Sequence, residues 1–241
     1  MNPLTARQTQ ILKALIDEYI ESADAVGSEA LEKKYNLGIS PATIRNEMVT
    51  LTKNGYLKQL HTSAGRVPTP SAMKFYIDQL MEEKSMSLAE EVKAKEDVWD
   101  VKDDLDKLLN GATHYLANKT GSLAVAATED GDVWHSGHAY ICSSPEFSDL
   151  RDCANLFGFL DETDRLIDLL FTRFPMETPF DVLFGEDVGL RQLPVGIVAA
   201  HFRAKGTNGA IGIIGPVRQS YASVVPTLRY YRGMIEEVMG L

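Results

Sequence analysis

Residues 38–69 read GISPATIRNEMVTLTKNGYLKQLHTSAGRVPT, and this stretch holds the clearest structural signals in the chain. Ser40 and Pro41 are typical of a helix start. A serine hydroxyl accepts a hydrogen bond from an unpaired backbone amide of the first turn, and proline has no amide hydrogen that would be left unpaired there. Apolar residues then recur at the spacing of one helix face: Ile44, Met48 and Leu51. Gly55 suits the left-handed conformation that ends many helices. The stretch therefore begins with a capped, amphipathic helix.

The opposite side of this predicted helix is polar. Its outward residues are Thr43, Asn46 and Thr50, flanked by Arg45 and Lys53. Arginine can pair with the O6/N7 edge of guanine, and asparagine with the N6/N7 edge of adenine. Such a face can enter a DNA major groove, although the same pattern also fits an ordinary solvated helix.

The preceding residues favour the DNA-binding interpretation. Thr5–Gln8 forms a capping-box pattern for a first helix, whose apolar face is Ile11, Leu12, Leu15, Ile16, Tyr19 and Ile20. Ser28 is expected to cap a short second helix, with Ala30, Leu31 and Tyr35 facing inward. Residues 36–39 then connect to the helix that begins after Ser40. Two helices, a glycine-containing turn and a third helix predict a helix-turn-helix.

A β-hairpin is predicted directly after this third helix. Its strands are expected at 56–60 and 66–67 with a turn at 61–65, and Thr69-Pro70 should cap a fourth helix with Phe75, Tyr76, Ile77 and Leu80 as its apolar residues. Three helices followed by a hairpin are the winged-helix order, and the hairpin tip is expected to reach the sugar-phosphate backbone or a minor groove. The candidate DNA-binding residues are Ser40, Thr43, Arg45, Asn46, Thr50, Lys53, His61, Thr62, Ser63 and Arg66.

These motifs resemble the heat-inducible transcription repressor HrcA family of bacteria. Residues 40–48 and 61–69 match that family almost letter for letter, and shorter matches lie at 4–8, 26–28, 144–147, 212–218 and 221–226. The resemblance implies a repressor of chaperone genes that binds an inverted-repeat operator as a dimer. It also implies dependence on the GroEL chaperonin and a GAF-like second domain.

The charge distribution is compatible with DNA binding. The 241 residues carry a net charge of −10, but residues 1–84 balance 10 basic against 10 acidic side chains. Between residues 40 and 76 there are five basic side chains and one acidic one, so the local charge is +4. Basic residues thus gather where phosphates would be contacted. The modest local charge suggests that useful affinity requires two subunits.

The rest of the chain predicts a helical connector and an α+β domain. The expected division is a winged-helix domain at 1–84, a connector of one or two solvent-facing helices at 85–118, and a GAF-like domain at 119–241. A dimerising helix pair is the alternative for the connector. Strands are predicted at 123–128, 133–138, 181–184, 196–203 and 210–214, and helices at 147–158, 162–171 and 221–239. Residues 205–209 are predicted to turn the chain between the last two strands, and Asn208-Gly209, between two apolar runs, is a hairpin signal.

The sequence departs from the family between the first strand of this domain and residues 145–147. Relatives carry an inserted dimerisation segment there, whereas residues 126–133 of this chain bridge the gap with a turn. Pairing must then use the 87–118 helix, the second domain or the last helix, or occur only on DNA. The second domain is favoured, with Leu228, Tyr231 and Ile235 contributing, although these residues also fit packing on their own sheet.

Other possible sites are weak. His135 and His138 near Asp132 could bind a metal, but residues three apart on a strand point to opposite faces. The glycine-rich run 206–215 lacks the helix start and Lys-Ser/Thr pair of a phosphate loop. Cys142 and Cys153 are expected to be thiols, with a redox switch as the alternative. No catalytic set and no cofactor site are recognisable. No signal peptide or long apolar run is present, so a cytoplasmic protein is expected.

Two classes of function remain. The favoured class is a winged-helix repressor that occupies an operator. The rival is a small-molecule sensor or enzyme whose activity resides in the GAF-like domain, with the winged helix as a protein-contact module.

Overall fold

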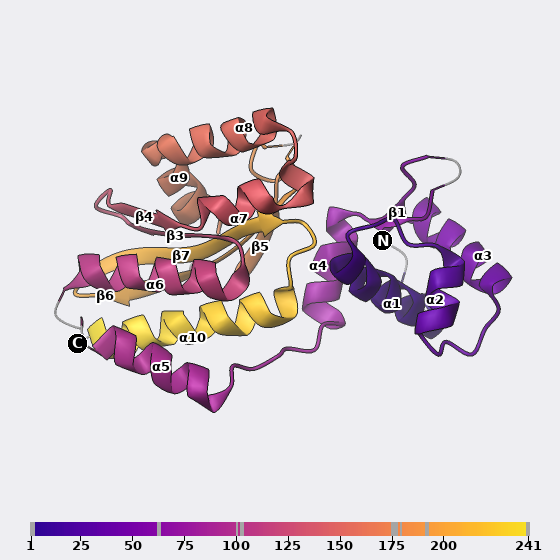
Figure 1. Ribbon diagram of the computed structural model, residues 1–241, viewed down its shortest axis with the longest axis horizontal. Coiled ribbons are helices and arrows are strands. Elements are labelled where there is room, and N and C mark those ends of the chain that lie inside the picture. Colours follow the sequence, from indigo (N-terminus) through magenta and orange to yellow (C-terminus); the bar gives the residue numbers. More distant parts are fainter. Residues whose placement is uncertain are drawn as a thin grey trace. The chain divides into compact units, whose positions relative to one another are not determined.

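The computed structural model describes residues 3–61, 64–99, 101, 104–174, 178, 180–190 and 193–239. The chain divides into two compact units, Met1–Glu82 and Glu83–Leu241 (Figure 1).

The first unit is a winged helix. Its elements are α1 (Ala6–Ser22), α2 (Ser28–Lys34), α3 (Pro41–Lys53), β1 (Leu57–Lys58), β2 (Val67–Pro68) and α4 (Pro70–Gln79). The strands β1 and β2 are antiparallel, and Val26 adds an isolated bridge to Arg66. Apolar residues at helical spacing meet in the core, because each helix buries one face. The core includes Ile11, Leu12, Leu15, Ile16, Leu31, Ile44, Met48, Leu51, Met73 and Ile77.

Three predicted helix caps are confirmed. The Thr5 hydroxyl accepts from the Gln8 backbone amide, and the Gln8 side-chain oxygen accepts from the Thr5 backbone amide, which completes the capping box. The Ser40 and Thr69 hydroxyls accept from the amides of Thr43 and Ala72. These side chains fix the first turns of α1, α3 and α4, where backbone amides lack helical partners.

The prediction for α2 was wrong in detail. Gly27 is the N-cap, Ser28 is the first helical residue and is buried, and no side chain caps this helix. The reason is the bridge between Val26 and Arg66, which holds the preceding backbone extended. Ala30 is exposed instead of inward, so only Leu31 of this helix is a fully buried apolar residue.

The second unit is an antiparallel α+β fold. Its helices are α5 (Leu88–Trp99), α6 (Leu105–Thr120), α7 (His138–Ser143), η1 (Pro145–Phe147), α8 (Leu150–Asp161), α9 (Thr163–Asp168), η2 (Leu169–Arg173) and α10 (Tyr221–Met239). Its strands are β3 (Leu123–Thr128), β4 (Val133–Ser136), β5 (Asp181–Phe184), β6 (Val195–Ala204) and β7 (Thr207–Pro216), in the sheet order β4-β3-β7-β6-β5. All neighbouring strands are antiparallel.

Helices cover both faces of this sheet (Figure 1). Alternate residues of β3 and β6 face a cluster with α8 and α9, because strand side chains alternate in direction. Members of this cluster include Leu123, Val125, Leu156, Leu166, Val195 and Ile197. On the other face α10 packs against β6 and β7, and α6 against β3 and β4. The sheet is therefore enclosed: β3 is buried along its whole length, and β6 and β7 are buried along most of theirs.

The residues predicted as a connector form α5 and α6 within the second unit. The prediction of solvent-facing helices was wrong for α6, which buries Leu108, Leu109 and Leu116 among other residues. On α10, Leu228, Tyr231 and Ile235 are buried as well, with exposed fractions of 0%, 1% and 0%. These three residues pack inside their own unit, so the predicted dimer contact through them was wrong.

Two local predictions in the second unit also need correction. The turn between β6 and β7 lies inside the predicted run 205–209, but it is made by Lys205 and Gly206, both left-handed, whereas Asn208 and Gly209 lie within β7. Gly209 is required there because a side chain would collide with the Phe202 ring. The strand β4 ends at Ser136, since the left-handed Gly137 turns the chain into α7.

Two stretches far apart in sequence meet at a half-buried ion pair. Arg218, after β7, donates to the Glu146 carboxylate in η1, and one of these bonds is 3.3 Å long. Burial raises the pKa of Glu146, but hydrogen bonds from Arg218 and Ser144 lower it by more, and the resulting pKa lies below the usual 4.5. The pair joins two of the segments that carry the family resemblance.

Candidate nucleic-acid interface

The outer face of α3 presents the predicted side chains to solvent. Arg45, Asn46 and Lys53 are exposed, and Thr43 and Thr50 are half-buried. Val49, which the sequence argument did not single out, is also exposed, at 37%. It lies four residues after Arg45 and four before Lys53, so all three share one side of the helix. Helical spacing from Arg45 was the signal that could have identified it.

The hydroxyl groups of α3 have partners within the helix. The Ser40 and Thr43 oxygens lie 3.0 Å apart, and the Thr50 hydroxyl donates to the Asn46 carbonyl at 3.2 Å. The Thr50 bond satisfies that hydroxyl within the helix, and the Ser40–Thr43 contact belongs to the cap of the helix, at its N-terminal half. In helix-turn-helix proteins that half contacts base edges.

Contacts from α1 fix how α3 is held. The Gln8 amide donates to the Glu47 carboxylate at 3.0 Å, and Arg7 lies 3.7 Å from the same group. Glu47 is the one acidic residue between 40 and 76, and these contacts turn it toward α1. The exposed face of α3 therefore keeps its cationic side chains without a competing carboxylate from its own helix.

The two strands of the wing are shorter than predicted, because each contains only two residues. His61 is exposed, and Thr62 and Ser63 lie outside the described residues. The Gln59 side-chain amide donates to the Ala64 carbonyl at 3.1 Å, and this bond joins the two sides of the hairpin near its tip. A side chain at Gly65 would collide with the backbone of Ala25 and Val26, so this glycine seats the wing on the protein.

Arg66 links the wing to α3. Its Nε donates to the Thr52 hydroxyl at 3.1 Å, and its Nη1 lies 3.4 Å and 3.5 Å from the Ala64 and Gly65 carbonyls. The residue is half-buried, and the predicted contact of its charge with DNA stays a prediction. Arg66 thus has a positioning role in the protein, beside any contact it makes with DNA.

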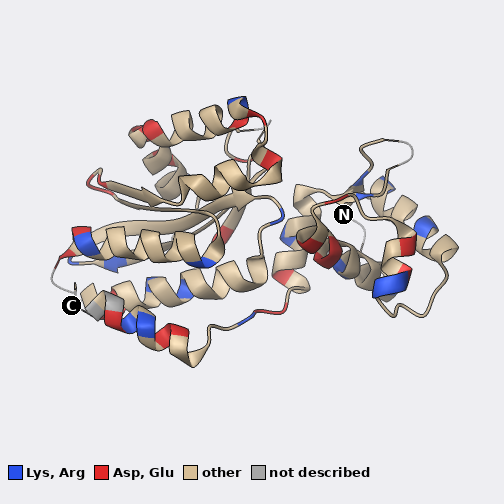
Figure 2. Ribbon diagram, viewed as in Figure 1, with Lys and Arg blue, Asp and Glu red and all other residues tan. Residues whose placement is uncertain are grey.

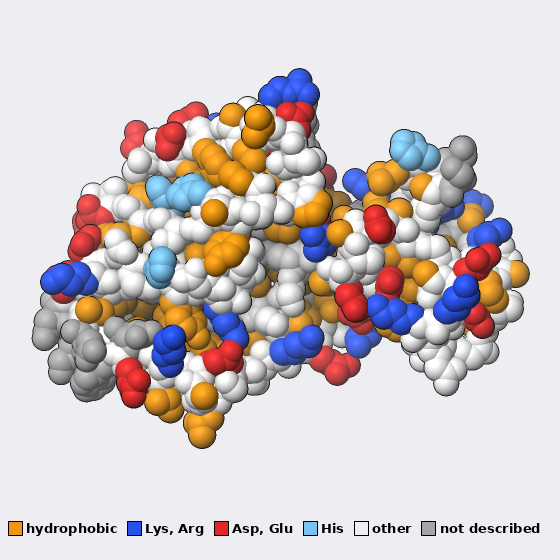
Figure 3. Space-filling model, in the orientation of Figure 1, with side chains coloured by type: hydrophobic (Ala, Val, Ile, Leu, Met, Phe, Trp, Pro, Cys, Tyr) orange, Lys and Arg blue, Asp and Glu red, His pale blue; other side chains and the backbone are white. Residues whose placement is uncertain are grey.

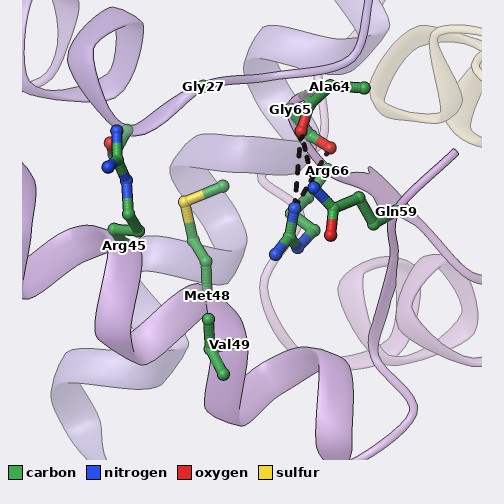
Figure 4. A pocket seen from close by; sticks show the side chains of 9 residues that line it. Gly27, Arg45, Met48, Val49, Gln59, Ala64, Gly65 and Arg66 are labelled. Atoms are coloured by element: carbon green, nitrogen blue, oxygen red, sulfur yellow. Dashed lines mark hydrogen bonds between the residues drawn. The ribbon is translucent and has the colours of Figure 1, made fainter. Parts of the chain in front are cut away.

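A hollow of about 450 Å³ separates α3 from the wing. It is lined by Gly27, Ser28, Arg45, Met48, Val49, Gln59, Ala64, Gly65 and Arg66. Figure 4 shows the side chains of Arg45, Met48 and Val49 extending from α3, and those of Gln59 and Arg66 extending from the wing. Two arginines and a carboxamide at its walls make the hollow suitable for an anionic group.

Figure 2 marks the charged residues along the helices of this unit, and the acidic residues of α1 pair with lysines. Lys34 of α2 lies 2.7 Å from Glu18 and 2.6 Å from Glu21 of α1, and these hydrogen bonds raise the pKa of Lys34. Lys13 lies 3.9 Å from Asp17 on α1. The acidic residues of α1 are therefore largely balanced by lysines.

The histidine pair of the second unit differs from its prediction. The His135 and His138 rings lie 4.8 Å apart and perpendicular, because Gly137 turns His138 into α7, so the argument that they face opposite ways was wrong. Histidine side chains reach the surface in Figure 3. Burial lowers the pKa of His138, and His135 lowers it further. Among the described residues, no three His, Cys, Asp or Glu side chains are arranged to hold a metal.

Cys142 is exposed and Cys153 is buried, and both are free thiols. Burial raises the pKa of the Cys153 thiol, which disfavours its reactive thiolate form. Within the described part of the chain, no helix combines the length and the apolar character needed to cross a membrane.

Three helices, a wing and a polar third-helix face define a winged helix-turn-helix protein. Residues 3–79 match the family model described as "Winged helix-turn-helix transcription repressor, HrcA DNA-binding", and residues 43–225 match "HrcA protein C terminal domain". The chain belongs to the HrcA family of heat-inducible transcription repressors.

Relatives align over nearly the whole chain. The repressor from Carboxydothermus hydrogenoformans is 26% identical over 336 residues, covering 97% of this chain and 98% of its own. The one from Clostridium acetobutylicum is 46% identical over 115 residues, 47% of this chain and 34% of its own. The first alignment is much longer than 241 residues, so that relative carries residues without a counterpart here.

A solved structure described as a hypothetical protein shares the fold. Its TM-score is 0.75 with 18% identity, and the match covers 98% of this chain and 97% of that one.

Proposed function

We propose that this chain is a DNA-binding transcription repressor that occupies an inverted-repeat operator, and that its targets are heat-shock chaperone genes. The observation that carries the proposal is the exposed Arg45-Asn46 face of α3 beside the wing. An arginine and an asparagine on a helix of this width can read guanine and adenine edges in a major groove. The wing then lies beside the neighbouring minor groove.

The hollow between α3 and the wing has a role in this arrangement. A major and a minor groove are separated by one sugar-phosphate strand, so that strand must pass between a helix in one groove and a hairpin in the other. Arg45, Gln59 and Arg66 line the space where it would pass. Their donors suit phosphate oxygens, which position a protein on DNA without reading its sequence.

We further propose that the repressor acts as a homodimer, because an inverted repeat is read most simply by two related subunits. Leu228, Tyr231 and Ile235 are buried, so another surface must form the contact. The helix α5 exposes Leu88 and Val92, one turn apart, at 76% and 48%. Dependence on the GroEL chaperonin is proposed from the family resemblance.

The test begins with selection of duplex DNA by the full-length chain from a random-sequence pool. We expect one inverted-repeat sequence to be enriched, and sedimentation velocity to give two chains per selected duplex and one per half-site duplex. L88E/V92E should weaken the two-chain complex, whereas L150E, at another exposed apolar residue, should not. Failure to enrich any sequence would contradict the repressor function. Enrichment with one chain per full duplex would contradict only the dimer.

For the chaperonin, the yield of operator-binding chains after refolding should rise when GroEL is added. An equal yield with and without GroEL would contradict that part of the proposal.

A further inference from the structure

The outer face of α3 contains an apolar residue among charged and polar ones. Val49 is 37% exposed, and its neighbours one turn away are Arg45, Asn46 and Lys53, all exposed. The buried stripe of the helix lies on the opposite side, at Ile44, Met48 and Leu51. Val49 therefore contributes little to the core of the winged helix.

Valine is also a poor choice for an exposed helix position on stability grounds. Its β-branched side chain loses rotamer freedom in a helix, so alanine, lysine or glutamate would stabilise this position more. Val49 lines the hollow beside Arg45 and Met48 (Figure 4). An apolar methyl pair at that place fits an apolar partner on the ligand.

We infer that Val49 is a specificity-determining residue that contacts the 5-methyl group of a thymine in each operator half-site. This inference rests on the proposed function. The thymine methyl is the apolar group that a base pair presents in the major groove. Three residues of α-helix advance about 4.5 Å, close to the ~3.4 Å between base pairs. Asn46 and Val49 therefore reach the same or neighbouring pairs, and the half-site contains a thymine where Val49 lies.

The test removes the methyl group from the DNA and the valine from the protein. The probe is the duplex selected by the wild-type chain, with single thymines replaced by deoxyuridine, which differs only by lacking the methyl. Burying one such group corresponds to about fourfold in affinity. We expect the wild-type chain to lose about fourfold at one thymine per half-site, and V49A to bind thymine and deoxyuridine duplexes equally at that position.

The matched control is N46A, which alters the same face but keeps Val49, and it should retain the fourfold preference for thymine. V49A should fold normally, because alanine is the better helix former at an exposed site.

Equal binding of every deoxyuridine duplex by the wild-type chain would overturn the inference, and so would a thymine preference that persists in V49A. In both cases the unmodified duplex is still bound, so the proposed function stands. If the wild-type chain selects no duplex at all, both the inference and the proposed function are overturned.

Discussion

At the scale of residues, Arg45 and Asn46 are the side chains on which sequence reading should depend. Each good bidentate base contact contributes about 1–3 kcal/mol of discrimination. We expect R45A and N46A to reduce preference for the selected operator over random duplex by that amount in a competition gel shift. N46A should leave random-duplex binding nearly unchanged, because it removes no charge.

The control for these variants is R151A, which removes an exposed arginine of the second unit. If both α3 variants keep the operator preference of the wild-type chain, Arg45 and Asn46 do not read the bases.

Arg66 and Thr52 allow positioning and charge to be separated. T52V removes the hydroxyl that receives the Arg66 Nε at 3.1 Å but keeps the cation. We expect it to weaken operator binding at every salt concentration, because the wing is held less firmly, without changing the salt slope. R66A should also lower the slope by about one, through loss of a phosphate contact. A salt titration by fluorescence anisotropy measures both.

Two results would count against these roles. Unchanged affinity in T52V would mean that this bond does not position the wing. An unchanged slope in R66A would mean that its guanidinium reaches no phosphate.

At the scale of elements, the sequence predicted the caps, α3 and α10 well because these are local properties. The Ser40-Pro41 cap and the Ile44-Met48-Leu51 spacing depend only on residues close together in the chain. Predictions failed where a distant segment decides the outcome. Val26 pairs with Arg66, which makes Gly27 the cap of α2. Gly209 pairs within β7, where a side chain would meet the Phe202 ring, and Lys205-Gly206 make the turn.

The candidate site was predictable to the same degree. The face of α3 followed from helical spacing, whereas the anchoring of Arg66 did not, because it depends on Thr52 fourteen residues earlier.

The cap of α3 gives a prediction at this scale. S40A should destabilise the winged-helix unit by about 1 kcal/mol, because the Thr43 amide loses its partner. For a unit of this size the thermal transition should fall by about 4–8 °C. S40N should retain stability, since asparagine caps equally well.

Both tryptophans, Trp99 and Trp134, lie after residue 82, so fluorescence follows the second unit alone. The S40A effect should therefore appear in the far-ultraviolet circular dichroism and not in the fluorescence transition. A wild-type melting curve for S40A would contradict the role of this cap.

At the scale of the whole molecule, the Glu146–Arg218 pair connects two distant parts of the second unit. The pKa of Glu146 in the folded state lies below its usual 4.5, so its contribution to stability is present above pH 4.5 and is lost as the pH falls below that value. Tryptophan fluorescence melts should show E146Q less stable than wild type at pH 7, with the difference shrinking below pH 4.5.

E237Q, at an exposed carboxylate of α10, serves as the control and should follow the wild-type curve throughout. A difference between E146Q and wild type that stays constant with pH would show that the carboxylate charge is not what stabilises the unit.

The boundary between the units falls between two consecutive glutamates. Glu82 lies 3.1 Å from Lys13 of the first unit, and Glu83 receives two hydrogen bonds from Arg229 of the second. The Met81 and Lys84 amides are also bonded, to Tyr76 and Ala222 of their own units. Four successive residues at this boundary are thus bonded within their own units, so the junction should offer a protease few unbonded residues to cleave.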